Sequence, residues 1–150
     1  MNIALLGFGT VGSHFYKLCE GRTDLHVAAV LSRRPRPELT CTVTADYDEI
    51  VRDPSIDIVV EVMGGIEPAR TYVEEAMKAG KQVVTANKDL LAEYGDPLFE
   101  IATENKCDLQ FEAAVAGAIP IIRPLRQSLA GSQLTEIMGI VNGTTNYILT

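Results

Sequence analysis

The sequence has 150 residues, and 47% of them are hydrophobic, which suits one globular domain with a buried core. Its formal net charge of −7 argues against general binding to nucleic acid or to acidic membranes. No apolar stretch approaches the roughly 20 residues that span a bilayer, and the opening leaves no room for a signal peptide. Cys19, Cys41 and Cys107 are widely spaced, and we expect reduced thiols in a cytoplasmic protein.

The chain opens with an apolar run, residues 2–6, that ends in a glycine loop. Gly7, Gly9 and Gly12 have the G-x-G-x-x-G spacing, and a helix-like segment follows at 13–20. This strand, turn and helix are typical of a dinucleotide-binding unit, whose helix N-terminus attracts a diphosphate. We therefore expect the cofactor to contact Gly7, Phe8, Gly9, Thr10, Val11 and Gly12. The alternative is a glycine-rich turn that binds nothing.

Expected strands and helices alternate along the rest of the chain. Strands are expected at 26–31, 41–44, 56–62, 82–86, 108–113 and 134–141. Helices are expected at 47–52, 67–79, 88–106 and 121–130, with a break in the third near Gly95-Asp-Pro97. The strands are continuous apolar runs, which indicates burial on both faces. The predicted fold class is α/β: a Rossmann-type, doubly wound, mostly parallel sheet with helices on both faces.

Arginines follow the second expected strand. In a dinucleotide-binding unit an acidic residue at this place selects NAD by accepting from the ribose 2′-hydroxyl. Here Leu31 is followed by Ser32, Arg33 and Arg34, with Arg36 close behind. Guanidinium groups suit the 2′-phosphate of NADP. We therefore predict that NADP is preferred over NAD and that Arg33 and Arg34 bind it, the alternative being a solvated surface loop.

Segments spread along the whole chain resemble the homoserine dehydrogenase family. They are GFGTVG at 7–12, EVMGGIEP at 61–68, VVTANK at 83–88, FEAAVAGAIPI at 111–121 and GIVNGTTNYIL at 139–149. The resemblance implies interconversion of L-homoserine and L-aspartate 4-semialdehyde with NAD or NADP. That reaction belongs to the biosynthesis of threonine, methionine and isoleucine. Gly64, in the second segment, is an expected cofactor contact.

Lys88 directly follows an expected strand, at the edge where open α/β sheets bind ligands. A cation there can meet a phosphate or polarise a substrate oxygen as charge develops. The resemblance implies that Lys88 contacts both cofactor and substrate, and we take it as the candidate catalytic residue. The alternative is a solvent-exposed lysine at a helix start, where a cation is unfavourable.

The segment 112–120 suits neither a helix nor a strand, because Gly117 and Pro120 interrupt it. One carboxylate together with turned carbonyl groups is a ligand set that a hard cation prefers. The resemblance implies a monovalent cation, sodium in the family, as a second cofactor. Its ligands would be the side chain of Glu112 and the carbonyls of Val115, Gly117 and Ile119. The alternative is that Glu112 caps or pairs locally.

The polar turn at 142–146 lies between two apolar runs. It can hold a small amino acid or merely cap a helix. The resemblance places Gly143 and Thr144 near homoserine. We expect a dinucleotide-binding domain at 1–130 and the truncated start of a substrate domain at 131–150.

The main acid/base group of the reaction is expected outside this sequence. In the family the proton-transferring lysine belongs to a region that would follow Thr150, the last residue here. The resemblance therefore implies that this chain alone is nearly inactive, and that the longer enzyme is a homodimer.

Two other functions fit the glycine loop. Another NAD(P)-dependent reductase of a small amino or semialdehyde acid shares the loop but not the run 142–149. A non-catalytic NAD(P) sensor needs neither Lys88 nor the oxygen ligands at 112–119.

Overall fold

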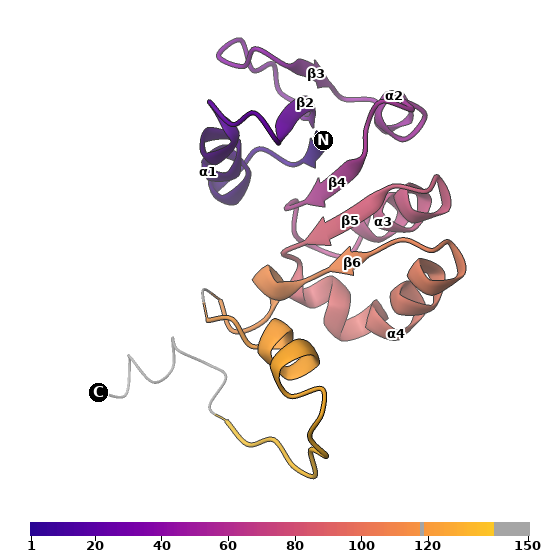
Figure 1. Ribbon diagram of the computed structural model, residues 1–150. Coiled ribbons are helices and arrows are strands. Elements are labelled where there is room, and N and C mark those ends of the chain that lie inside the picture. Colours follow the sequence, from indigo (N-terminus) through magenta and orange to yellow (C-terminus); the bar gives the residue numbers. More distant parts are fainter. Residues whose placement is uncertain (118, 140–150) are drawn as a thin grey trace.

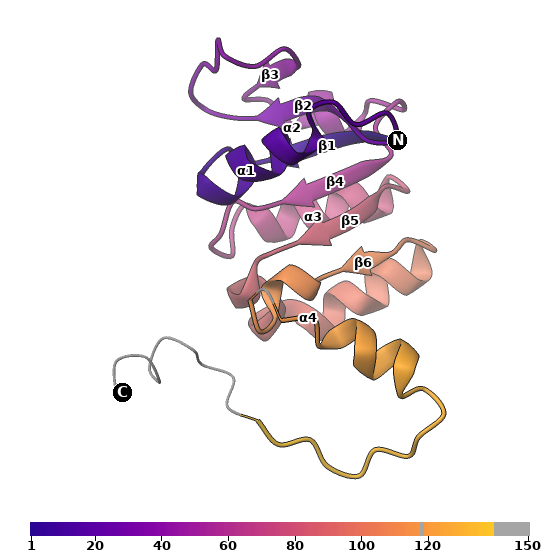
Figure 2. The same cartoon turned by 60° about the vertical axis from the view of Figure 1, so that its left-hand side comes forward.

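The strands form a six-stranded parallel sheet in the computed structural model, which describes residues 1–117 and 119–139. The strands are β1 (Asn2–Leu6), β2 (His26–Leu31), β3 (Thr42–Thr44), β4 (Ile58–Glu61), β5 (Gln82–Thr85) and β6 (Leu109–Gln110). Their order is β3-β2-β1-β4-β5-β6. Figure 1 shows the sheet, and Figure 2 shows it with all six strands labelled. The chain starts at the centre, winds to one edge, and returns to build the other half, which confirms the predicted doubly wound fold.

Helices cover both faces of the sheet. They are α1 (Thr10–Cys19), α2 (Tyr47–Val51), α3 (Ala69–Lys78) and α4 (Lys88–Glu104). Figure 2 shows α1 on one face and α3 and α4 on the other. Alternate residues of β1 serve the two faces, since Ala4 and Leu6 pack with α2, α3 and α4, and Ile3 and Leu5 pack with α1. None of these helices, in the residues described, is long and apolar enough to cross a membrane.

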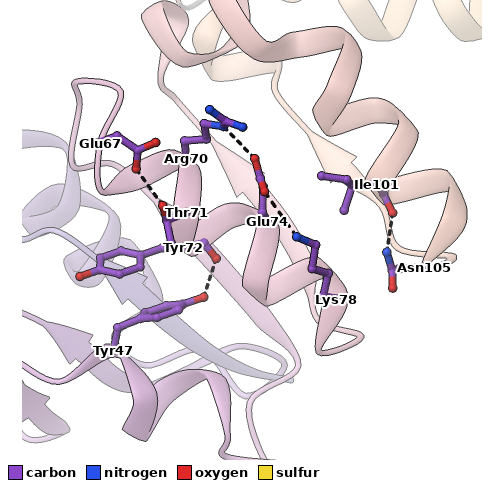
Figure 3. Close-up of polar contacts among 9 residues, drawn as sticks. All are labelled: Tyr47, Glu67, Arg70, Thr71, Tyr72, Glu74, Lys78, Ile101 and Asn105. Carbon is purple, nitrogen blue, oxygen red and sulfur yellow. Dashed lines mark hydrogen bonds and ion pairs between the residues drawn. The ribbon is translucent and has the colours of Figure 1, made fainter.

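Polar contacts attach α3 to its neighbours (Figure 3). The Tyr47 hydroxyl donates to the Tyr72 carbonyl oxygen at 2.5 Å, and the two rings stack with centroids 4.0 Å apart. Arg70 pairs with Glu74 at 2.8 Å. Its guanidinium lies 4.2 Å from the centre of the Tyr94 ring in α4. Helix α3 is therefore fixed to both α2 and α4, which anchors the loop that leads into it from β4.

The expected break in the helix after β5 is present. Tyr94 has non-helical backbone angles, φ −128° and ψ 17°, inside α4. Pro97 lies about one turn further on. Its ring conflicts with the carbonyl of the residue four positions earlier, and a proline has no N–H to donate to that carbonyl. The prediction of a kinked helix is confirmed.

One predicted strand is shorter than expected, and another is wrong. The strand expected at 108–113 is limited to β6, because the 3₁₀-helix η1 (Glu112–Ala114) follows it at once. Residues 134–139 are not a strand, since no strand of the described sheet pairs with them; residues 140 and 141 lie outside the described residues. The helix expected at 121–130 contains the π-helix η2 (Pro124–Ser128), in which Leu129 N–H donates to the Pro124 carbonyl.

All three cysteines lie in the described part of the chain, and they form no disulfide. Cys19 and Cys107 are buried among core side chains, as expected for packing residues. Burial raises the pKa of both thiols, which opposes formation of a reactive thiolate.

Candidate functional site

The glycine loop connects β1 to α1 at the carboxyl edge of the sheet. Gly7 has a φ of +98°, and a Cβ there would lie 3.1 Å from the Cα of Met63. A Cβ on Gly12 would lie 2.3 Å from the Gly7 carbonyl oxygen. Both positions are therefore restricted to glycine by the close approach of α1, β1 and the loop after β4.

Gly9 differs, because no atom lies within 4 Å of the position a Cβ would take. It is the N-cap of α1, with no side chain capping the helix and no acidic residue in the first turn. The first N–H groups of a helix have no partner within the helix and attract anions. The open space at Gly9 and the uncapped helix end fit a bound diphosphate.

The three arginines after β2 differ in their surroundings. Arg33 and Arg34 are exposed, and their side chains form no hydrogen bond or ion pair within the described part of the chain. Arg36 instead donates from Nη2 to the Phe8 carbonyl at 3.2 Å, and its guanidinium lies 5.1 Å from the centre of the Phe8 ring. Its buried Nε has no hydrogen-bond partner among the residues described. The arginine in contact with the glycine loop is thus Arg36, which spacing alone did not distinguish.

The predicted contact Gly64 lies in the loop after β4, beside a buried carboxylate. Glu61, the last residue of β4, is fully buried. Its Oε1 accepts from Met63 N–H at 2.8 Å and Gly64 N–H at 3.3 Å, and its Oε2 accepts from the Thr85 hydroxyl at 2.5 Å. The carboxylate therefore joins the loop after β4 to the end of β5.

Asn87 extends this network to the start of α4. Its N–H donates to Thr85 Oγ1 at 3.0 Å, and its Nδ2 donates to the Gly65 carbonyl at 2.5 Å. Its Oδ1 accepts from Leu90 N–H at 3.1 Å, which caps α4. Lys88 comes next; its side chain is exposed and has no hydrogen bond or ion pair to any residue described. The ammonium group is therefore available at the edge where ligands bind.

Sequence reasoning missed Glu61, Thr85 and Asn87 as members of the site. One signal was present, because an acidic residue that ends a continuous apolar strand must find donors when it is buried. Nothing in the sequence indicated that the donors come from two separate loops.

Glu112 caps the helical segment that follows it in the chain. Its Oε1 accepts from Ile121 N–H at 2.5 Å and Ile122 N–H at 2.9 Å, and its Oε2 accepts from Arg123 N–H at 2.8 Å. Burial acts to raise the pKa of this carboxyl, but the three donors outweigh it and hold the pKa below its usual value. The local cap, left open as an alternative above, is what the geometry shows.

The other three predicted cation ligands lie in a tight turn after Glu112. Ala116 and Gly117 have left-handed backbone angles, with φ of 55° and 61°. The carbonyls of Val115, Gly117 and Ile119 accept no hydrogen bond from any residue described. These three carbonyl oxygens, together with the lone pair left free on Glu112, are oxygen ligands of the kind that a hard cation prefers.

The expectations for the end of the chain fall on residues 140–150, which lie outside the described residues. Gly143 and Thr144, the predicted substrate contacts, are among them, and so is Thr150, after which the proton-transferring lysine is expected. These expectations stay predictions, as does the domain boundary between residues 130 and 131.

A doubly wound parallel sheet with a glycine loop at its switch point and an uncapped helix behind it defines a dinucleotide-binding domain. A family model described as the NAD binding domain of homoserine dehydrogenase matches residues 7–112. A second, described as homoserine dehydrogenase, matches residues 120–150. The chain belongs to the homoserine dehydrogenase family.

Relatives and solved structures agree with this assignment. The homoserine dehydrogenases of Bacillus subtilis and Corynebacterium glutamicum are 42% and 48% identical over 100% and 99% of this chain, which covers 38% and 36% of them. A crystal structure of the Thiobacillus denitrificans enzyme is 40% identical, with a TM-score of 0.90 over 99% of this chain and 38% of its own. A hyperthermophilic archaeal homoserine dehydrogenase in complex with NADPH is 26% identical, with a TM-score of 0.74 over 87% of this chain and 49% of its own.

The cap formed by Glu112 predicts an acid-sensitive helix start. Because its folded pKa is lowered, the stabilisation is present above the unfolded value of about 4.3 and is lost as the pH falls through the folded pKa. In an NMR titration we expect the pKa of the Glu112 carboxyl to lie below its usual value. The amides of Ile121, Ile122 and Arg123 should shift with the same midpoint.

Glu112→Gln should abolish the titration of these amides. Glu104→Gln, at an exposed carboxylate of α4, is the control and should leave it unchanged. A Glu112 midpoint at or above the usual value would contradict the cap.

Proposed function

We propose that this chain is the cofactor-binding part of an NADP-preferring homoserine dehydrogenase. The longer enzyme would interconvert L-homoserine and L-aspartate 4-semialdehyde in threonine, methionine and isoleucine biosynthesis. The observation that carries the proposal is the uncapped N-terminus of α1. It follows a loop in which positions 7 and 12 have no room for any residue but glycine. Family membership supports homoserine as the substrate. It favours neither of the two alternatives, another NAD(P)-dependent reductase or a non-catalytic NAD(P) sensor.

The described residues are suited to bind and orient a nicotinamide cofactor. The N–H groups at the start of α1 would hold the diphosphate, and the open space at Gly9 would admit it. When bound, the nicotinamide supplies the hydride-transfer chemistry. The NADPH complex of the archaeal relative supports this class of cofactor.

Lys88 would act on the substrate rather than on the diphosphate. Its exposed ammonium stands at the end of β5, two strands from the glycine loop, where it can stabilise negative charge that develops on the substrate oxygen. The proton-transferring lysine would come from a region beyond Thr150, since this chain spans less than two fifths of the length of its bacterial relatives.

Removal of the Lys88 ammonium should therefore slow turnover. In the full-length protein, with whatever region accompanies this chain, we expect Lys88→Ala to lower kcat/KM for homoserine-dependent NADP reduction by about 100-fold or more. Lys78→Ala, at an exposed lysine of α3, is the matched control and should retain the original rate. Thermal unfolding midpoints of both variants should stay close to that of the unchanged protein. Unaltered kinetics in Lys88→Ala would refute the role.

The preference for NADP would come from the arginines after β2. Arg33 and Arg34 are exposed and unpaired within the described residues, which leaves both guanidinium groups available to a phosphate. Loss of both should weaken NADP binding about tenfold or more, because even one hydrogen bond to a charged group contributes about 1.5–3 kcal/mol. We expect NAD affinity to change little in the Arg33→Gln/Arg34→Gln variant.

Dissociation constants for both cofactors, measured by fluorescence titration, test this preference. Arg52→Gln, at an exposed arginine in an ion pair at the end of α2, is the control. Equal affinity for NAD and NADP in the unchanged protein would rule out a preference for NADP. Equal losses of NAD and NADP affinity in the double variant would rule out selection by Arg33 and Arg34.

We also propose a monovalent cation, sodium, at Glu112, Val115, Gly117 and Ile119. Support comes from the oxygen-only donor set and its carbonyls without partners among the described residues. Turnover should fall when sodium and potassium are replaced by bulky organic cations. Glu112→Gln should lose the response to added sodium, whereas Glu104→Gln should keep it. Full activity in organic cations alone would exclude a required ion.

Two further parts of the proposal concern the whole protein. We propose that it works as a homodimer, as the family resemblance implies. We also propose a cytoplasmic location, which the three free cysteines support, since oxidising compartments favour disulfides.

A further inference from the structure

We propose that Glu61 is a positioning residue of the cofactor site. Its buried carboxylate joins residues 62–65, in the loop after β4, to Thr85, the last residue of β5, which leads into the loop of residues 86 and 87. The inference rests on the proposed function, because it takes these two loops to border the bound cofactor.

Hydrogen-bond donors surround the buried Glu61 carboxylate. Every group on it is a donor: the N–H groups of Met63 and Gly64 on Oε1, and the Thr85 hydroxyl on Oε2. Thr85 Oγ1 accepts from Asn87 N–H and donates to Glu61 Oε2. No ion pair to Glu61 occurs among the residues described. A charge buried without a cation is unfavourable unless such donors solvate it.

No neutral side chain of the same shape satisfies these donors together. A glutamine has one acceptor oxygen and one NH₂ group. With its oxygen toward Met63 and Gly64, the NH₂ would face Thr85 Oγ1, and the Thr85 proton would lose its acceptor. With its oxygen toward Thr85, two backbone N–H groups would lose theirs. A carboxylate is therefore required by the loops rather than by the apolar core around it.

On one side the carboxylate fixes the residue that packs on the glycine loop. Met63, held through its N–H, has its Cα 3.1 Å from the place where a Cβ on Gly7 would stand. Val62 N–H donates to the Leu6 carbonyl at 3.0 Å, which keeps the same segment against the end of β1. Displacement of the Met63 backbone would therefore displace the loop proposed to bind the diphosphate.

On the other side the carboxylate fixes the backbone that carries Lys88. Thr85 connects Glu61 to Asn87, and Asn87 both caps α4 and donates to the Gly65 carbonyl. The Glu61 side chain thus fixes the position of the glycine loop relative to the start of α4. Because both loops are held without any ligand, binding does not have to order them, which favours affinity.

The test begins with NADPH affinity of the full-length protein, measured by fluorescence titration. We expect Glu61→Gln to raise the dissociation constant about tenfold, as the loss of a charge-assisted hydrogen bond implies. Thr85→Val should raise it severalfold, and Thr85→Ser, which keeps the hydroxyl, should restore it to within about twofold. The two Thr85 variants keep the test informative if Glu61→Gln fails to fold.

A matched control separates positioning from general destabilisation. Tyr47→Phe removes another partly buried hydroxyl bond to a backbone carbonyl, between α2 and α3 and outside the two loops that Glu61 joins. It should lower the free energy of unfolding without changing NADPH affinity. Affinity unchanged in Glu61→Gln and Thr85→Val, or lowered equally in Tyr47→Phe, would overturn the inference.

A kinetic cycle tests whether Glu61 acts through Lys88. Glu61→Gln should lower kcat about tenfold in the unchanged background, and little further in Lys88→Ala, because a misplaced lysine and a missing one have similar effects. Fully additive losses would overturn this part. A protein that shows the NADPH effects but no homoserine-dependent turnover would refute the proposed function and still support a positioning role in cofactor binding.

Discussion

The parallel alignment of the strands is the constraint on which the site depends. All neighbouring strands in the described sheet run the same way, so their carboxyl ends gather at one edge. The register pairs Leu6 with Leu31 on one side and with Glu61 on the other, and Glu61 with Thr85. Loops that are distant in the sequence therefore leave the sheet side by side. Hydrogen bonds such as that from Thr85 to Glu61 are a direct consequence of this register.

Burial on both faces is what allows such a sheet to be stable. Its central strands are mostly apolar, and the alternate residues of β1 are divided between two separate clusters of core side chains. Glycine is needed where a helix must approach a strand closely, as at Gly12 against the Gly7 carbonyl. Packing and cofactor binding therefore both require glycine in this turn. A helix that packs closely on the strand also brings its N–H groups to the edge of the sheet.

Two carboxylates near this edge are used in the same chemical way. Glu61 and Glu112 each accept three hydrogen bonds from donors supplied by neighbouring loops or a helix start. Each fixes the path of the chain after a strand without the help of a cation from the described residues. At Glu112 one acceptor position is left for a further partner, whereas at Glu61 the loops enclose the carboxylate completely.

The sequence by itself determined the fold class, the glycine loop and the approximate bounds of most elements. Those properties depend on local patterns: apolar runs, glycine spacing, and proline as a helix breaker. The tertiary structure decided that Arg36 contacts Phe8, that Glu61 joins two loops, and that Glu112 caps a helix. It also ended β6 at Gln110 and left residues 134–139 outside the described sheet. These outcomes depend on which groups meet in space, and a buried polar group is satisfied by whatever donor the fold brings to it, at whatever distance along the chain.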